Sequence, residues 1–123
     1  MINGGFLDLS FGTAGEFFPT SVSTSLWLNP NFSELDSKNI FKNLKKNDTF
    51  VDIGANIGFL SLVAWSKIGD HGKIIAVEGN YKIAKYLKKN VELNKANIKV
   101  FNLIVGENNG YAGMQNRKAD DMN

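Results

Sequence analysis

The sequence predicts an α/β protein built on a partial parallel β-sheet, with strands in the order 3-2-1 and helices on both faces. Two observations carry this prediction. Residues 49–53, 73–77 and about 98–104 are short, apolar and rich in β-branched side chains, as is typical of buried parallel strands. Segments of helical character separate these runs, and parallel strands need crossover connections of that kind.

Composition divides the chain into three parts. Residues 1–32 are a preamble rich in Gly, Ser, Thr and Phe, for which irregular structure or short strands at 6–11 and 22–28 are predicted. Residues 33–107 form the partial α/β domain. Residues 108–123 are polar and lack periodicity, so a disordered tail is predicted there.

Two of the predicted helices flank the first strand. The earlier one begins at an N-cap, Ser33, carries two acidic residues in its first turn and runs to about Lys46. The later one covers residues 57–68, and the Gly-Asp-His-Gly segment at 69–72 ends it. His71 in that segment is the only histidine of the chain. We expect it to be solvated at the sheet end that lies opposite the predicted binding site.

A third helix is predicted over residues 81–93. Asn94 follows it, and asparagine tolerates the left-handed conformation of a helix C-cap. The helix has an apolar stripe and a basic face, formed by Ile83, Leu87 and Val91 and by Lys82, Lys85, Lys88 and Lys89 respectively. The lysines are therefore interpreted as a solvated surface rather than a binding patch.

The turn after the first strand carries the chemistry. Gly54-Ala55-Asn56-Ile57-Gly58 lets the backbone turn tightly and approach a ligand without a Cβ in the way. Glu78 ends the second strand about 20 residues after the last glycine, a spacing that suits an acid on a ribose diol. An ionised carboxylate accepts hydrogen bonds from both hydroxyls of a diol. Ligands of open parallel sheets bind at these strand ends, so a nucleoside site is predicted.

The same turn indicates which nucleoside binds. A dinucleotide fingerprint needs glycine where this chain has Asn56 and Phe59, and no G-K-[ST] follows the turn, which excludes a P-loop. Asp52 at the strand end would repel a pyrophosphate but suits a ligand that carries an ammonium or sulfonium group. The pattern favours S-adenosylmethionine over NAD, FAD or a nucleoside triphosphate.

The predicted cofactor-binding residues lie in the two loops that follow the first two strands. They are Asp52, Gly54, Ala55, Asn56, Gly58, Glu78, Gly79 and Asn80. Each has a structural alternative. The glycines can serve only as turn residues, Asp52 can bind amides of its own loop, and Glu78 can be a mere exposed acid. For Asn56 and Asn80 a turn role and a ligand role stay equally open. No catalytic residue is assigned, and no metal site is predicted.

Four segments together resemble the FkbM-type branch of class I S-adenosylmethionine-dependent methyltransferases: VDIGANIGFLSLVA, GKIIAVEGN, YLKKNVELN and NIKVFNLIVGE. The resemblance covers residues 47–107. It implies a Rossmann-like three-layer α/β/α fold, S-adenosylmethionine as cofactor with S-adenosylhomocysteine as product, and methyl transfer to a hydroxyl of a small molecule or sugar. The family usually has proline where Gly79 stands. Its later D-x-E-G segment has no counterpart before Asn123.

Two other functions remain as alternatives. In one, the chain is a non-catalytic cofactor-binding or interaction remnant. In the other, it is a fragment of a nicotinamide-dependent oxidoreductase, which the missing G-x-G-x-x-G disfavours. Leu103 and Ile104 stand where related enzymes often place an acid against adenine, so adenine is expected to be held by packing and backbone groups. No fourth strand follows Gly106 to cover the first strand. Either the preamble of residues 1–32 folds back as an edge strand or two copies pair as a homodimer through this open edge.

Composition excludes several classes of protein. With 43% hydrophobic and 21% charged residues the chain of 123 residues is an ordinary small globular domain. Its net charge of +2 is too small to indicate nucleic-acid or membrane binding. The chain has no cysteine, no signal peptide is recognisable, and no apolar run approaches the roughly 20 residues that span a bilayer. A cytoplasmic protein is expected.

Overall fold

The computed structural model describes residues 34–114. Its elements in chain order are α2 (Glu34–Asn43), β1 (Thr49–Ile53), α3 (Phe59–Ile68), the 3-10 turn η1 (Gly69–His71), β2 (Lys73–Val77), α4 (Tyr81–Leu93) and β3 (Lys99–Phe101). The predictions for the preamble, for the Ser33 cap and for residues 115–123 lie outside the described part. The described residues of the predicted tail, 108–114, form no helix or strand and are exposed.

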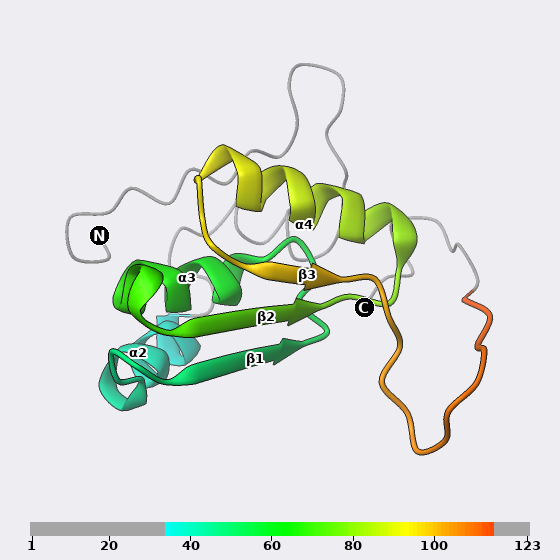
Figure 1. Cartoon of the computed structure of the whole chain (residues 1–123), viewed down its shortest axis with the longest axis horizontal. Coiled ribbons are helices and arrows are strands. Elements are labelled where there is room, and N and C mark those ends of the chain that lie inside the picture. The colour runs from blue at the N-terminus through cyan, green and yellow to red at the C-terminus, as the bar shows by residue number, and fades with distance from the viewer. Residues whose placement is uncertain (1–33, 115–123) are drawn as a thin grey trace.

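The three strands form one parallel sheet in the order β1-β2-β3, which confirms the predicted order 3-2-1 (Figure 1). β1 pairs with β2 from Thr49 opposite Lys73 to Ile53 opposite Val77. β2 in turn places Val77 opposite Phe101 of β3. All three strands therefore end level with one another, and the loops that follow them leave from one edge of the sheet.

The core lies between the sheet and the helices. Side chains alternate along each strand, and one set, which includes Ile74 and Ala76, packs against α3 and α4. Leu62 of α3 and Leu87 of α4 are fully buried in this layer. The apolar stripe predicted for α4 is confirmed as its buried face, and the four lysines predicted to point away from it are exposed. α2 packs on the outer side of α3.

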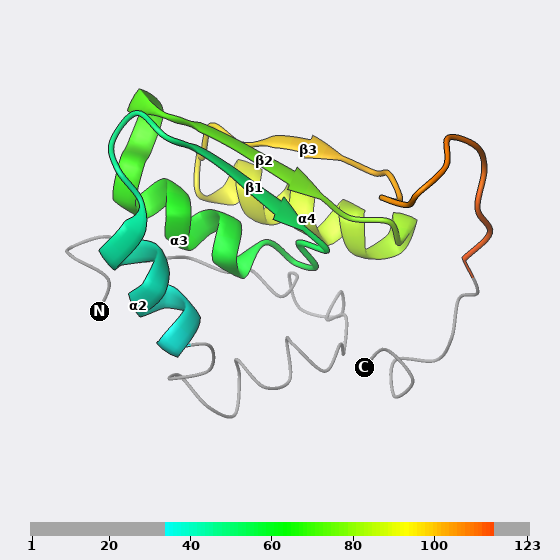
Figure 2. The ribbon, with the colours of Figure 1, turned by 90° about the horizontal axis from the view of Figure 1, so that it is seen from below.

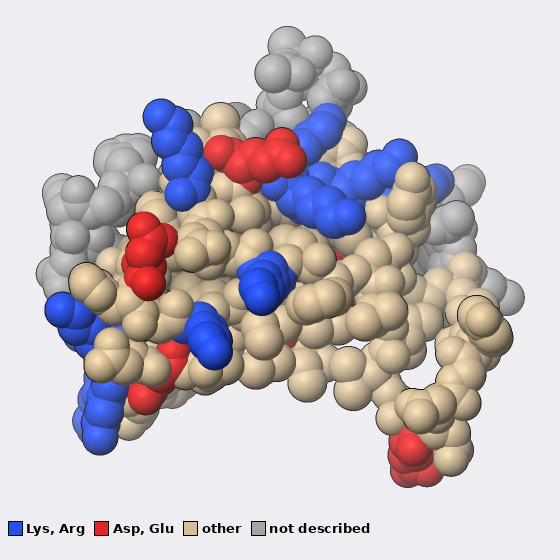
Figure 3. Space-filling view, viewed as in Figure 1, with Lys and Arg blue, Asp and Glu red and all other residues tan. Residues whose placement is uncertain are grey.

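The helices of the described residues cover only one face of the sheet, whereas helices on both faces were expected (Figure 2). Both crossovers advance in the same direction, from β1 to β2 and then to β3, and connections of the same hand then place α3 and α4 on the same side. The other face leaves Val51, Ile53 and Phe101 51%, 62% and 42% exposed. Figure 3 shows this face as a mainly uncharged surface with scattered lysines.

The outer side of β1 has no strand partner among residues 34–114. This placement agrees with the open edge expected from the sequence, because β1 is an edge strand of the described sheet. Pairing of two copies along that edge stays a prediction.

Three predicted boundaries are wrong by a few residues. α2 ends at Asn43 rather than near Lys46, because a turn follows in which the Asp48 carboxylate accepts the Lys45 amide at 2.8 Å. α3 begins at Phe59 rather than residue 57, because Gly58 has a φ of 93° that no right-handed helix accommodates. β3 ends at Phe101 rather than residue 104.

The end of α4 also differs from the prediction. Asn94 has right-handed φ and ψ, and the left-handed residue is Lys95, with a φ of 52°. The Ala96 amide donates to the Val91 carbonyl and the Lys95 amide to that of Glu92, both at 3.0 Å, which is a Schellman ending. Asn94 stays helical while its side chain donates to the Asn90 carbonyl at 2.8 Å.

Candidate cofactor-binding site

The candidate site lies at the edge of the sheet where the three strands end together. The loop after β1 (residues 54–58), the loop after β2 (residues 78–80) and the segment after β3 all start there, on the right of Figure 1. All eight residues predicted to bind the cofactor stand in these loops or at the end of β1. The common level of the strand ends is what brings residues of separate loops together.

The loop after β1 is a turn with three left-handed residues. Gly54, Asn56 and Gly58 have φ values of 79°, 52° and 93°. The Gly54 and Ala55 amides both donate to the Val77 carbonyl, at 2.8 and 2.9 Å, and this ties the turn to the end of β2. A Cβ at Gly54 would meet no atom within 4 Å, so the backbone is open to a ligand there. Ala55 is buried in the core, so only its backbone faces the turn.

Gly58 forms part of the turn and also lies against α4. A Cβ at this position would lie 2.5 Å from Cδ1 of Leu87, so the fully buried Leu87 side chain would have to shift. Gly58 itself is buried. Its absent side chain therefore lets α4 approach the glycine turn closely.

Glu78 joins the two loops. Its carboxylate accepts the Asn56 amide at Oε2, at 2.9 Å, and the Asn80 amide at Oε1, at 2.8 Å. Glu78 is only 8% exposed, so it is not the merely exposed acid of the alternative interpretation. Each carboxylate oxygen has a further lone pair, and Glu78 lines the hollow at the strand ends. A diol can therefore be accepted without loss of the two amide bonds.

The two asparagines have different roles. Asn80 is the N-cap of α4, and its Oδ1 accepts the Lys82 and Ile83 amides at 3.0 and 3.3 Å. Its side chain thus takes the turn role. Asn56 contacts Glu78 through its backbone, while its Oδ1 is buried and has no hydrogen-bond partner among the described residues.

Asp52 lies half-buried at the end of β1 beside the turn. Its Oδ2 accepts the hydroxyl of Ser61 at 2.6 Å, so its described side-chain partner is a residue of α3 rather than a loop amide. Burial raises the pKa of Asp52 above its ordinary 3.8, and the Glu78 carboxylate adds to the rise. Two carboxylates near the strand ends suit a cationic group.

We expect the Asp52→Asn variant to be more stable than the parent at neutral pH. The folded-state pKa of Asp52 is raised, so its ionisation costs stability once the pH exceeds 3.8, and the cost grows until the folded-state pKa is passed. The amide oxygen of the variant can still accept the Ser61 hydroxyl. Urea unfolding at about pH 4 and about pH 7.5 measures the effect. If the stability difference between the variant and the parent is the same at both pH values, the pKa of Asp52 is not raised in the folded state.

The structure adds site residues that sequence reasoning did not identify. Asn102 donates through Nδ2 to the carbonyls of Glu78 and Gly79, at 2.8 and 3.0 Å, and so holds the loop after β2. Ser61 is fully buried beneath Asp52. Asn90 is a polar residue on the buried face of α4, which is a signal that the sequence did offer.

A hollow of about 210 Å³ opens beside these loops. It is lined by Ile53, Gly54, Val77, Glu78, Gly79, Leu103, Ile104, Val105 and Met114. The lining is mostly apolar, and it includes the two residues expected to pack against adenine. Gly79 gives room to the segment after β3, because a Cβ there would lie 2.9 Å from Cγ1 of Ile104.

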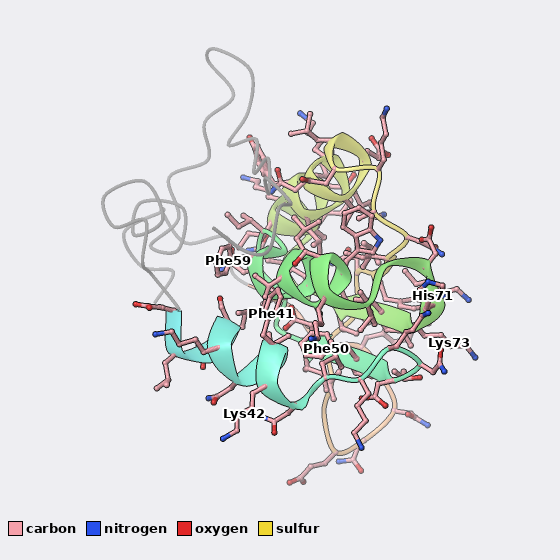
Figure 4. The ribbon with its side chains drawn as sticks, turned by 90° about the vertical axis from the view of Figure 1, so that its left-hand side faces the viewer. Phe41, Lys42, Phe50, Phe59, His71 and Lys73 are labelled. Atoms are coloured by element: carbon pink, nitrogen blue, oxygen red, sulfur yellow. The ribbon has the colours of Figure 1, made fainter. Side chains whose placement is uncertain are left out.

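The opposite end of the sheet is separate from this site. His71 and Lys73 lie there, before the start of β2 and at its first residue, and both are exposed (Figure 4). The expectation of a solvated histidine away from the site is confirmed. Within residues 34–114 no helix has the length and apolar character to cross a bilayer. In the same range no three acidic or histidine side chains cluster as a metal site would require.

Comparison with known proteins places the fold. The family profile described as the Vibrio cholerae RfbT protein matches residues 1–121. No curated protein matches the sequence. A putative transferase of Pyrococcus horikoshii, PH0793, is 29% identical with a TM-score of 0.50, over 57% of this chain and 27% of that one.

Two further solved structures are methyltransferases by their descriptions. An S-adenosylmethionine-dependent methyltransferase of Aquifex aeolicus is 25% identical with a TM-score of 0.52, over 70% of this chain and 47% of that one. A putative protein-L-isoaspartate O-methyltransferase of Plasmodium falciparum, solved with S-adenosylhomocysteine, is 19% identical with a TM-score of 0.53. The match covers 60% of this chain and 38% of that one. The chain thus has a Rossmann-like methyltransferase fold and spans less than half the length of these proteins.

Proposed function

This chain belongs to the family of the Vibrio cholerae RfbT protein, and from that premise and the strand-end geometry we propose that it binds S-adenosylmethionine for methyl transfer. The observation that carries the proposal is the buried Glu78 carboxylate, which joins the glycine turn to the loop after β2. An acid in this position can bind a ribose diol while it keeps both loops in place.

Different described residues would bind different parts of the cofactor. Glu78 would accept hydrogen bonds from the ribose hydroxyls, and the open backbone at Gly54 would let the ligand approach closely. Asp52, when ionised, would provide negative charge for the cationic methionyl end, and the apolar hollow would receive the adenine ring. When bound, S-adenosylmethionine supplies a methyl group on a positively charged sulfonium. The chain's own contribution is to orient the sulfonium and exclude water around it.

The finer proposal is that the protein is of the FkbM type and methylates a hydroxyl oxygen of a small molecule or sugar. What supports it is the resemblance of the four segments VDIGANIGFLSLVA, GKIIAVEGN, YLKKNVELN and NIKVFNLIVGE to the FkbM type. No described residue is assigned as the acceptor's base. A cofactor-binding chain without transfer is the second candidate, because residues 34–114 provide candidate cofactor-binding residues and none of them is assigned a catalytic role.

We expect the 123-residue chain to bind S-adenosylhomocysteine and not NAD at matched concentrations. The turn lacks the glycines that admit a pyrophosphate, and Asp52 would repel one. Isothermal titration calorimetry with both ligands measures the difference. Tighter binding of NAD would overturn the proposal in favour of an oxidoreductase fragment. Transfer of a labelled methyl group to a hydroxyl acceptor separates an enzyme from a binding remnant.

A further inference from the structure

Asn90 is a polar side chain in the middle of the core. It lies on α4 and is 1% exposed, between the buried Leu87 one turn earlier and the buried Val91. Burial of an amide costs free energy unless its polar atoms find partners. Asn90 meets that condition only in part, because its Oδ1 has no hydrogen-bond partner among the described residues.

The other half of the amide reaches the glycine turn. Nδ2 of Asn90 donates to the Ile57 carbonyl at 2.9 Å, across 33 positions of sequence. That carbonyl precedes α3, because the first backbone bond from the turn into the helix runs from the Leu62 amide to the Gly58 carbonyl at 2.9 Å. The Asn90 side chain therefore donates to a carbonyl of the turn that lies before the first backbone hydrogen bond of α3.

The same face of α4 contacts the next residue of the turn as well. Leu87 lies against Gly58, where a Cβ would come within 2.5 Å of its Cδ1. Leu87 and Asn90 are three positions apart and hence neighbours on one helical face. One side chain of α4 thus fixes Ile57 by a hydrogen bond, and another fixes Gly58 by packing.

We propose that Asn90 is a positioning residue for the cofactor: its hydrogen bond to Ile57 holds the turn in the left-handed conformation that opens Gly54 to the nucleoside. A leucine would fill similar space without an unpaired oxygen, but it would leave the buried Ile57 carbonyl without a donor. The donor to Ile57 is the property that only the polar side chain provides. The role in binding rests on the proposed function, whereas the role in the turn does not.

The Asn90→Leu variant of the full chain tests the proposal. We expect the amide of Gly58, which donates to the Ala55 carbonyl at 2.9 Å, to exchange with deuterium faster and to shift in the NMR spectrum. We expect the affinity for S-adenosylhomocysteine to fall about tenfold, and the midpoint of urea unfolding to fall as well, because the buried Ile57 carbonyl loses its donor.

Val91→Ala is the matched control. It removes buried volume from the adjacent position of α4 and keeps the Asn90 donor to Ile57, so the unfolding midpoint should fall. The Gly58 amide should exchange at the same rate relative to other core amides as it does in the parent. The affinity for S-adenosylhomocysteine should stay within about twofold of the parent's. Should the leucine variant not fold, Asn90→Met supplies a flexible apolar side chain without the donor, and the same results are expected of it.

The outcomes separate the two claims. Parent-like exchange at Gly58 and parent-like affinity in the folded Asn90 variants would overturn the positioning role. If the parent itself does not bind S-adenosylhomocysteine, the proposed function fails, and exchange at Gly58 still decides whether Asn90 holds the turn.

Discussion

Replacement of Glu78 by alanine is expected to weaken binding of S-adenosylhomocysteine by about 1.5–3 kcal/mol, the range for hydrogen bonds to a charged group. The substitution removes the acceptor of the ribose hydroxyls. It also leaves the Asn56 and Asn80 amides without the carboxylate that accepts both of them, so the free energy of unfolding should fall by about 2–5 kcal/mol. Calorimetric titration and urea unfolding measure the two effects.

Glu92→Ala is the control for this experiment, because Glu92 is an exposed acid on α4 away from the strand ends. Its loss should leave affinity and stability unchanged within about 0.5 kcal/mol. If the Glu78→Ala variant binds S-adenosylhomocysteine like the parent, the ribose assignment is wrong. If it binds weakly but unfolds like the parent, the carboxylate does not support the loops.

Gly58→Val is expected to abolish cofactor binding and to destabilise the fold by about 3–5 kcal/mol. A β-branched residue at a φ of 93° is strained, and its Cβ would meet Leu87 at 2.5 Å. Either the fully buried Leu87 side chain or the turn must then shift. Thermal unfolding and calorimetric titration with S-adenosylhomocysteine measure the loss.

A double-mutant cycle separates the two causes. Leu87→Ala removes the side chain that a Cβ at position 58 would meet, so Gly58→Val should cost less in that background. The remaining cost is then the backbone strain. An equal cost in both backgrounds would contradict the close approach of α4 to the turn.

Much of the fold follows from local patterns. The strands are short β-branched runs, and the turn and Glu78 stand at their ends, so residue order alone was enough to predict that these candidate site residues share one edge of the sheet. The two hydrogen bonds of Glu78 were not, because they depend on the left-handed residues of the turn. The bond from Asn90 to Ile57 spans 33 positions and has no local signature beyond a polar residue on a buried face.

The errors have a similar origin. A C-cap at Asn94 is a fair prediction from propensity, but the Asn94 side chain bonds back to Asn90 and the next residue, Lys95, takes the positive φ. Helices on both faces would require strands beyond β1, and the described residues provide none. Sequence pattern gives the type of each element, whereas these features depend on tertiary contacts.

The central claim is that the strand ends bind the nucleoside of S-adenosylmethionine. The most direct measurement is the NMR spectrum of the isotope-labelled chain during titration with S-adenosylhomocysteine. We predict that the amides of Gly54, Asn56 and Asn80 shift, while those of His71 and Lys73 at the other end of the sheet stay in place. Shifts confined to the His71 end, or unchanged amides at Gly54 and Asn80 under saturating ligand, would contradict the account.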